Sequence, residues 1–122
     1  MAKPGAVTIY GIRNCDTMKK ARAWLDARGI AYAFHDYKTA GIERRVLDGW
    51  VREAGWETLL NRAGTTFRRL PEKDRSGLTA SRAIALMVAE PSMIKRPVLA
   101  AQGRLHVGFR PEQYEKIFGA RR

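Results

Sequence analysis

The cysteine at position 15 is the side chain in this sequence with the clearest capacity for covalent chemistry. It lies in the stretch YGIRNCDTMKKARAWL, after a short apolar run and before a segment with helical spacing. A helix N-terminus carries about half a positive charge and unpaired N–H groups, which favour the thiolate that acts as nucleophile. The position therefore predicts a nucleophilic Cys15. The alternative is a cysteine that only fills space in the core.

The residues around Cys15 indicate which thiol could resolve a covalent adduct on its sulfur. Position 18 holds Met18, so the chain has no C-x-x-C pair and no internal thiol to resolve an adduct. A thiol from outside the chain, such as glutathione or a glutaredoxin, must then complete the reaction. Asp16 is expected to raise the pKa of the neighbouring thiol unless it caps the helix. Basic side chains that could lower this pKa follow in the sequence: Arg13, Lys19 and Lys20.

The sequence has no pattern typical of a metal site, a serine hydrolase or a phosphate-binding loop. His35 and His106 have no metal-ligand spacing with Cys15, so no metal site is predicted. No motif of a serine hydrolase and no glycine-rich phosphate loop is present. We expect no bound cofactor.

Length and composition are those of one globular domain, residues 1–122, with a single core. The 23 basic and 12 acidic residues leave a net charge of +11, which favours anionic partners or forms a solvated basic surface. No helix-turn-helix or zinc-finger motif favours direct nucleic-acid binding. No apolar run suits a membrane span and the first residues do not suit a signal peptide, so we expect a cytoplasmic protein with reduced Cys15.

The elements that must position Cys15 are a strand, a helix and a second strand. Residues 6–11 predict a buried strand, residues 14–28 a helix capped by Asn14, and residues 30–37 another strand. Such a βαβ unit places its two strands parallel.

The second half of the chain changes from helices to a hairpin. Helices are predicted over residues 43–54 and 79–90, with a short helical turn and an irregular polar loop between them. Two apolar runs around AQGR predict a β-hairpin, and residues 110–119 a last helix. The order indicates an α/β thioredoxin-like fold. It has a mixed four-stranded sheet, built from βαβ and ββα halves, and a helical insertion at about residues 41–92.

Four motifs together resemble the arsenate reductase-like (ArsC) family, in the branch that includes YffB-type proteins and Spx-type regulators. They are YGIRNCDTMKKARAWLDARGIAYAFHDYK, LLNRAGTTFRRL, PSMIKRPVL and GFRPEQY, in the expected order from about Val7 to Phe118. The resemblance implies a thioredoxin-like fold with Cys15 as redox nucleophile. It also implies a site arginine, Arg96, followed by a cis-proline, Pro97, that faces the cysteine.

The same resemblance supplies further site residues. Arg62 in LLNR and Arg110 in GFRP match arginines that hold an oxyanion beside the sulfur, and Asn14 matches the residue before the nucleophile. Arginine keeps its charge and presents a planar fork to oxyanions and carboxylates. The alternative for each arginine is a surface charge or a weak ion pair.

The implied function is that of a reductase with one cysteine. We expect Cys15 to attack arsenic in a small oxyanion or sulfur in a mixed disulfide, with glutathione as co-substrate. Asp16 departs from the arsenate reductases and argues against arsenate, because its charge repels an incoming oxyanion. The second hypothesis is an Spx-like regulatory protein that binds the transcription machinery without turnover, although the C-x-x-C switch of those regulators is absent. The third is a redox-inert member of the fold.

Overall fold

The computed structural model describes residues 6–119, which divide into two compact units. The first contains the chain up to Asp36 and from Arg96 onward, and the second contains Tyr37–Lys95. The predicted insertion, residues 41–92, falls entirely within the second unit. Among residues 6–119, no helix is long and apolar enough to cross a membrane.

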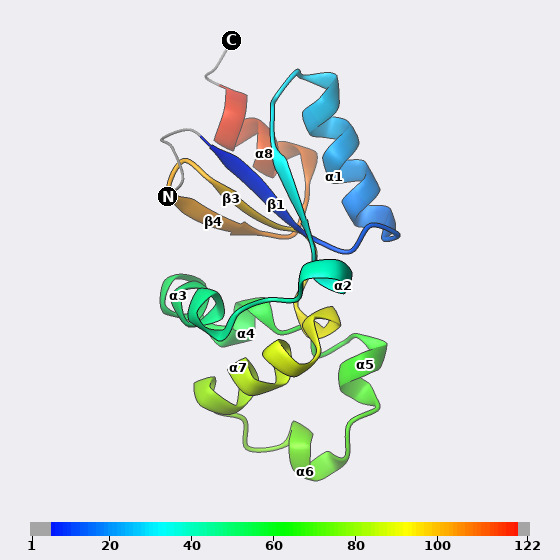
Figure 1. Cartoon of the computed structure of the whole chain (residues 1–122), viewed down its shortest axis with the longest axis vertical. Helices are drawn as coiled ribbons and strands as arrows, with labels where there is room; N and C mark the ends of the chain where they lie inside the picture. The colour runs from blue at the N-terminus through cyan, green and yellow to red at the C-terminus, as the bar shows by residue number, and fades with distance from the viewer. Residues whose placement is uncertain (1–5, 120–122) are drawn as a thin grey trace. The chain divides into compact units, whose positions relative to one another are not determined.

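A mixed four-stranded sheet forms the centre of the first unit (Figure 1). Its strand order is β2-β1-β3-β4, with β1 and β2 parallel and the other neighbouring pairs antiparallel. The strands are β1 (Val7–Gly11), β2 (Ala33–Asp36), β3 (Val98–Ala101) and β4 (Arg104–Val107). The predicted α/β fold, with βαβ and ββα halves, is confirmed.

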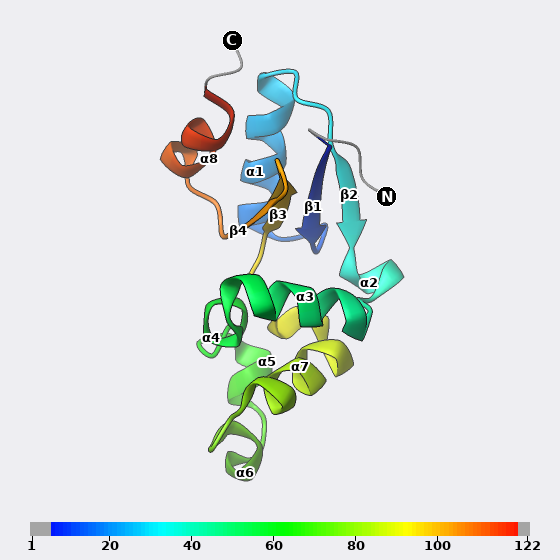
Figure 2. The ribbon, with the colours of Figure 1, turned by 90° about the vertical axis from the view of Figure 1, so that its left-hand side faces the viewer.

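Two helices, α1 (Asp16–Ala27) and α8 (Pro111–Phe118), pack on the same face of this sheet (Figure 2). Alternation along the strands directs Val7, Ile9 and Leu99 to that face. The helices contribute their apolar stripes to the same core: Met18, Ala21, Trp24, Leu25, Tyr114 and Phe118. This core fixes the strand-to-helix turn that carries Cys15.

Both predicted bounds of the second strand and the predicted cap of the first helix were wrong, each for a local reason. The second strand begins at Ala33 and not at residue 30, because the Ile30 N–H is already bonded to Leu25 O at 3.0 Å in the turn that ends α1. It ends at Asp36, and Tyr37 begins the short helix α2 (Tyr37–Ala40). At the start of α1, extended Cys15 occupies the N-cap position, so Asn14 does not cap the helix.

The β3–β4 hairpin turns through Gln102 and Gly103. Their φ angles of 57° and 75° are both positive, as a two-residue turn of the type I′ family requires. Glycine adopts this conformation without strain, whereas Gln102 is the one non-glycine residue with positive φ among residues 6–119. The turn sets the register in which Ala101 faces Arg104.

The second unit is helical and has its own core. Its longer helices, α3 (Arg44–Ala54) and α7 (Ala80–Ala89), pack together. The shorter elements are α4 (Trp56–Leu59), α5 (Thr65–Arg68), α6 (Glu72–Arg75) and the 3₁₀-helix η1 (Pro91–Met93). Its buried side chains include Leu47, Trp50, Leu59, Leu60, Phe67, Met87 and Ile94.

The region predicted as an irregular polar loop contains α5 and is followed by α6, so this part of the chain is more ordered than expected. Buried Phe67 anchors α5. The guanidinium of Arg82 donates to the carbonyls of Lys73 (3.0 Å), Ser76 (3.3 Å) and Gly77 (3.4 Å), and so ties α6 to α7. These contacts join residues five to nine positions apart through a side chain and backbone carbonyls, which helical periodicity does not reveal.

Candidate functional site

Cys15 is the residue that joins β1 to α1, immediately before the first turn of the helix. Its backbone is extended, with φ −123° and ψ 129°, and its carbonyl accepts the Lys19 N–H at 2.9 Å. The side chain is partly buried against the core of the first unit, and the thiol is free. The turn therefore holds a half-exposed sulfur at the positive end of a helix of 12 residues.

The pKa of Cys15 is lowered from the ordinary value of a thiol. Burial raises it, but the backbone N–H groups of Met18 and Thr17, together with the hydrogen bond and charge of the Arg96 side chain, outweigh burial. Hydrogen bonds from these groups to the sulfur favour its charged form. A larger fraction of this thiol is thiolate at neutral pH than for a free cysteine.

Arg96 comes from the loop before β3 and is the arginine whose side chain hydrogen bonds the Cys15 sulfur. The Arg96–Pro97 peptide bond is cis, and Pro97 is buried. The Pro97 carbonyl accepts the N–H of Gly108 at 2.8 Å. This bond ties the loop that carries Arg96 to the segment that leads from β4 into α8.

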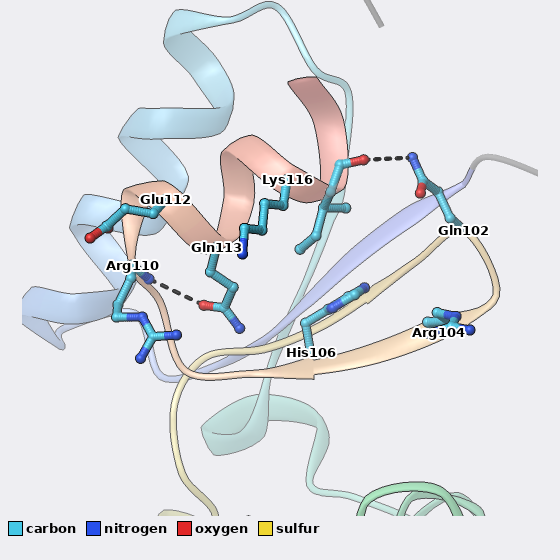
Figure 3. Close-up of a pocket in the computed structure, with 8 residues that line it drawn as sticks. Gln102, Arg104, His106, Arg110, Glu112, Gln113 and Lys116 are labelled. Carbon is cyan, nitrogen blue, oxygen red and sulfur yellow. Dashed lines mark hydrogen bonds between the residues drawn. The ribbon is translucent and has the colours of Figure 1, made fainter. Parts of the chain in front are cut away.

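Two other predicted site residues of the first unit, Asn14 and Arg110, lie at the starts of α1 and α8. Asn14 is exposed beside Cys15. Arg110 is the N-cap residue of α8, and its backbone N–H donates to the Gln113 side chain at 3.2 Å. Its guanidinium lines a pocket between β4 and α8 (Figure 3). The anion-binding roles assigned to Asn14 and Arg110 remain predictions.

Arg62 belongs to the second unit. It follows the bridge between Leu60 and Ile94, is exposed, and holds its guanidinium 5.5 Å from the centre of the Trp56 ring. Its predicted role in anion binding also remains a prediction.

The side-chain charge that lowers the pKa of Cys15 comes from Arg96, whereas Arg13, which is near Cys15 in sequence, has a different partner. Arg13 lies over the ring of Phe34, 5.2 Å from its centre, and Arg22 lies 4.5 Å from the same centre. Arg22 also donates to the hydroxyl of Tyr32 at 3.3 Å. Sequence spacing missed this pairing because Phe34 comes from β2, which lies beside β1 only in the folded sheet.

Gly11 and Met18 form a second feature that sequence analysis missed. Gly11 ends β1, and a Cβ placed there would overlap the sulfur of Met18, which is fully buried. The strand end and the first turn of α1 therefore approach closely beneath Cys15. A glycine that is invariant among related sequences is the usual sign of such a close contact, and a single sequence does not show which glycines are invariant.

Within residues 6–119, no three His, Cys, Asp or Glu side chains gather in a way that could hold a metal ion. The arrangement at Cys15 suits thiolate chemistry with an anionic or sulfur-containing reactant.

A family model described as the ArsC family matches residues 10–117. The chain belongs to the ArsC family. The match spans the Cys15 turn, the whole second unit, the Arg96–Pro97 loop and nearly all of α8. The predicted family resemblance is confirmed.

Solved structures share the fold of this chain, and a curated relative is similar to it in sequence. A structure of a YFFB protein is 56% identical, with a TM-score of 0.89, over 92% of this chain and 98% of that one. An arsenate reductase (ArsC) related protein from Brucella melitensis is 58% identical, with a TM-score of 0.76, over 97% and 98%. The global transcriptional regulator Spx of Streptococcus mutans is 27% identical over 88% of this chain and 79% of the regulator.

Proposed function

We propose that this ArsC-family protein is a glutathione-dependent thiol/disulfide reductase that uses Cys15 as its one nucleophile. The observation that carries the proposal is the environment of the sulfur. Cys15 lies half-exposed at the N-terminus of α1, and Arg96 and two backbone N–H groups lower its pKa. These features activate a cysteine for attack, whereas an inert structural cysteine needs none of them.

The reaction proceeds in two exchanges. The Cys15 thiolate attacks the glutathione sulfur of a mixed disulfide; the new S–S bond joins Cys15 to glutathione, and the substrate sulfur leaves and takes a proton. A second glutathione, as thiolate, attacks the glutathione sulfur of this adduct. The products are the reduced substrate thiol, glutathione disulfide and the Cys15 thiolate. One free glutathione is consumed for each mixed disulfide, so its sulfur is oxidised as the substrate sulfur is reduced.

Arg96 has two roles in this proposal. Its positive charge stabilises the Cys15 thiolate before attack and again when Cys15 becomes the leaving group. Its planar guanidinium also suits a carboxylate of bound glutathione or an oxyanion. Asn14 lies beside Cys15 and Arg110 is the N-cap residue of α8, and both would extend such a binding site within the first unit.

Arsenate is the less favoured substrate. Asp16 follows Cys15 directly and is exposed, so its carboxylate repels a doubly charged oxyanion that approaches the sulfur. A mixed disulfide brings no such charge to the reacting atoms. This difference favours disulfide over arsenate at the same thiolate.

A coupled assay tests the proposal. Glutathione, glutathione reductase and NADPH are supplied, with and without glutaredoxin, and a small glutathione mixed disulfide or arsenate is offered separately. We expect NADPH oxidation with the disulfide, lost in Cys15→Ser and retained in Lys20→Gln, which alters an exposed charge of α1. Turnover of arsenate alone would make the protein an arsenate reductase, and no turnover of either would reject the enzyme.

The similarity to the Spx regulator supports a second candidate function, a regulatory protein that binds the transcription machinery without turnover. This function does not need Cys15 chemistry, because the C-x-x-C pair is absent. RNA polymerase from the same cells, immobilised and offered wild type and Cys15→Ser, tests it. Equal retention of both would support the regulator, and retention of neither would reject it.

A further inference from the structure

A pocket of about 430 Å³ lies between β4 and α8 in the first unit, apart from the residues that act on the Cys15 sulfur (Figure 3). Its size falls within the range of small-molecule sites. Arg104 and His106 line it from β4, and Arg110 and Lys116 line it from α8 and the start of that helix. Neither Arg104 nor Lys116 has a role in the proposed thiol chemistry.

The charge of this pocket is positive, with three cationic side chains against one carboxylate. Arg104, Arg110 and Lys116 carry permanent positive charges at neutral pH, whereas Glu112 is the one carboxylate among the lining residues. Within residues 6–119, none of the three cationic side chains has an ion-pair partner; the ion pairs described there are Arg28–Glu115 and Arg45–Glu43. Three like charges around one cavity repel one another until an anion enters.

Hydrogen bonds hold the walls of the pocket in place. Gln113 accepts from the Arg110 N–H at 3.2 Å and donates to the Val107 carbonyl at 3.3 Å, which joins the start of α8 to the end of β4. At the other end, Gln102 donates to the Ile117 carbonyl at 3.0 Å and joins the hairpin turn to the end of α8. Figure 3 draws the Arg110–Gln113 bond and the bond donated by Gln102 as dashed lines.

The two guanidinium groups lie at opposite ends of the pocket (Figure 3). Arg104 begins β4 and Arg110 follows its end, and three residues of strand alone span about 10 Å. Lys116 projects from α8 between them. Guanidinium groups bind carboxylates and phosphates through paired hydrogen bonds, so each end presents a receptor for one acidic group.

We propose that the pocket between β4 and α8 binds a small organic anion with an acidic group at each end. Arg104 and Arg110 hold the two acidic groups, and Lys116 holds one of them from the side. Ile117 offers an apolar surface to the carbon chain between them. The site shares Arg110 with the anion-binding site proposed beside Cys15, whereas Arg104, Lys116 and Ile117 take no part in the proposed thiol reaction.

Titration by NMR on nitrogen-labelled Cys15→Ser protein tests the site without thiol chemistry. Adipate, a linear dicarboxylate, is the probe, and acetate at twice its concentration is the control with one acidic group. We expect saturable shifts of the backbone amides of Arg104, Gln113 and Lys116 with adipate, and much weaker binding of acetate. Equal affinity for the two anions, or shifts confined to the amides around residue 15, would overturn the proposal.

Charge variants in the same background identify the binding groups. Arg104→Gln and Lys116→Gln should each weaken adipate binding about tenfold, because each removes one charge-assisted hydrogen bond. Lys20→Gln makes the same change of charge on the exposed part of α1 and should leave the affinity unchanged. A loss as large in Lys20→Gln would show that net charge alone attracts the anion, which would contradict a built site. The spectra of the unliganded variants verify that each is folded.

Discussion

The Arg96 side chain donates a hydrogen bond to the sulfur of Cys15, although the two residues lie far apart in the sequence. The antiparallel pairing of β1 with β3 brings them together, since Cys15 follows β1 and Arg96 precedes β3. The Cys15 turn thus receives its charge from a distant part of the sequence. Its basic neighbours contribute less, as Arg13 lies over Phe34.

Replacing Arg96 tests this relationship directly. Arg96→Gln should raise the pKa of Cys15 toward that of a free thiol, about 8.5, because the positive charge on its hydrogen-bond partner is lost. The measurement is the rate of alkylation by iodoacetamide as a function of pH. At neutral pH the rate should fall in Arg96→Gln and stay unchanged in Lys20→Gln. An unchanged pH midpoint in Arg96→Gln would show that the helix N–H groups alone set the pKa.

The lowered pKa of Cys15 also predicts a pH dependence of stability. A thiol whose pKa is lower in the folded than in the unfolded chain stabilises the fold in its ionised form. The excess stability of wild type over Cys15→Ser should be smallest below the folded pKa, grow as pH rises through it, and level off above about pH 8.5. Urea unfolding of both proteins under reducing conditions measures this difference. A difference independent of pH would contradict the lowered pKa.

The sequence was sufficient to predict the strands, the longer helices and the position of Cys15, because these depend on local periodicity and turn residues. The Cys15–Arg96 pair was reached only through the family motifs, since nothing in the spacing of IKRP reveals which strand it meets. The stack of Arg13 on Phe34 was missed because it joins two segments that are far apart in sequence. The order around α6 was missed because it depends on hydrogen bonds from the Arg82 side chain to backbone carbonyls, which leave no periodic pattern.

Charge patterns were the least informative part of the sequence. The excess of basic residues predicted an anionic partner but no place for it. The pocket between β4 and α8 arises because residues 104 and 110 flank one strand and the helix that follows. Only the folded hairpin and helix turn those side chains toward a common cavity.

Replacing Tyr114 tests the role of a buried hydroxyl in the core of the first unit. Its ring makes edge contacts with Trp24 and Phe109, at centroid distances of 5.5 and 4.7 Å, while its buried hydroxyl has no hydrogen-bond partner within residues 6–119. Tyr114→Phe keeps the ring and removes an unsatisfied polar group, so stability should stay constant or rise by about 1 kcal/mol.

The same change at Tyr32 serves as the matched control for Tyr114. The Tyr32 hydroxyl accepts a hydrogen bond from Arg22, so Tyr32→Phe should lower stability by about 0.5 to 1.5 kcal/mol. Chemical unfolding of both variants provides the comparison. A loss in Tyr114→Phe as large as that in Tyr32→Phe would indicate that the buried hydroxyl is satisfied in solution.

Replacing Gly11 tests whether the close approach of β1 to α1 is needed for the stability of the protein and for the lowered pKa of Cys15. In Gly11→Ala the added methyl group overlaps the buried side chain of Met18, which has no exposed surface into which it can move. We expect a loss of about 1 to 3 kcal/mol in the free energy of unfolding, as for other overpacked cores. Because Met18 lies in the first turn of α1 and its N–H acts on the sulfur, the pKa of Cys15 should rise as well.

Gly49 in α3 provides the opposite case for the same substitution. The nearest atom to a Cβ at Gly49 is a terminal nitrogen of Arg52 at 3.8 Å, an ordinary contact. Gly49→Ala should therefore stabilise the protein by about 0.4 to 1 kcal/mol through its higher helix propensity. Urea unfolding and iodoacetamide alkylation of both variants separate the effects. If Gly11→Ala were as stable as Gly49→Ala and as reactive as wild type, the close approach of β1 to Met18 would not govern the Cys15 turn.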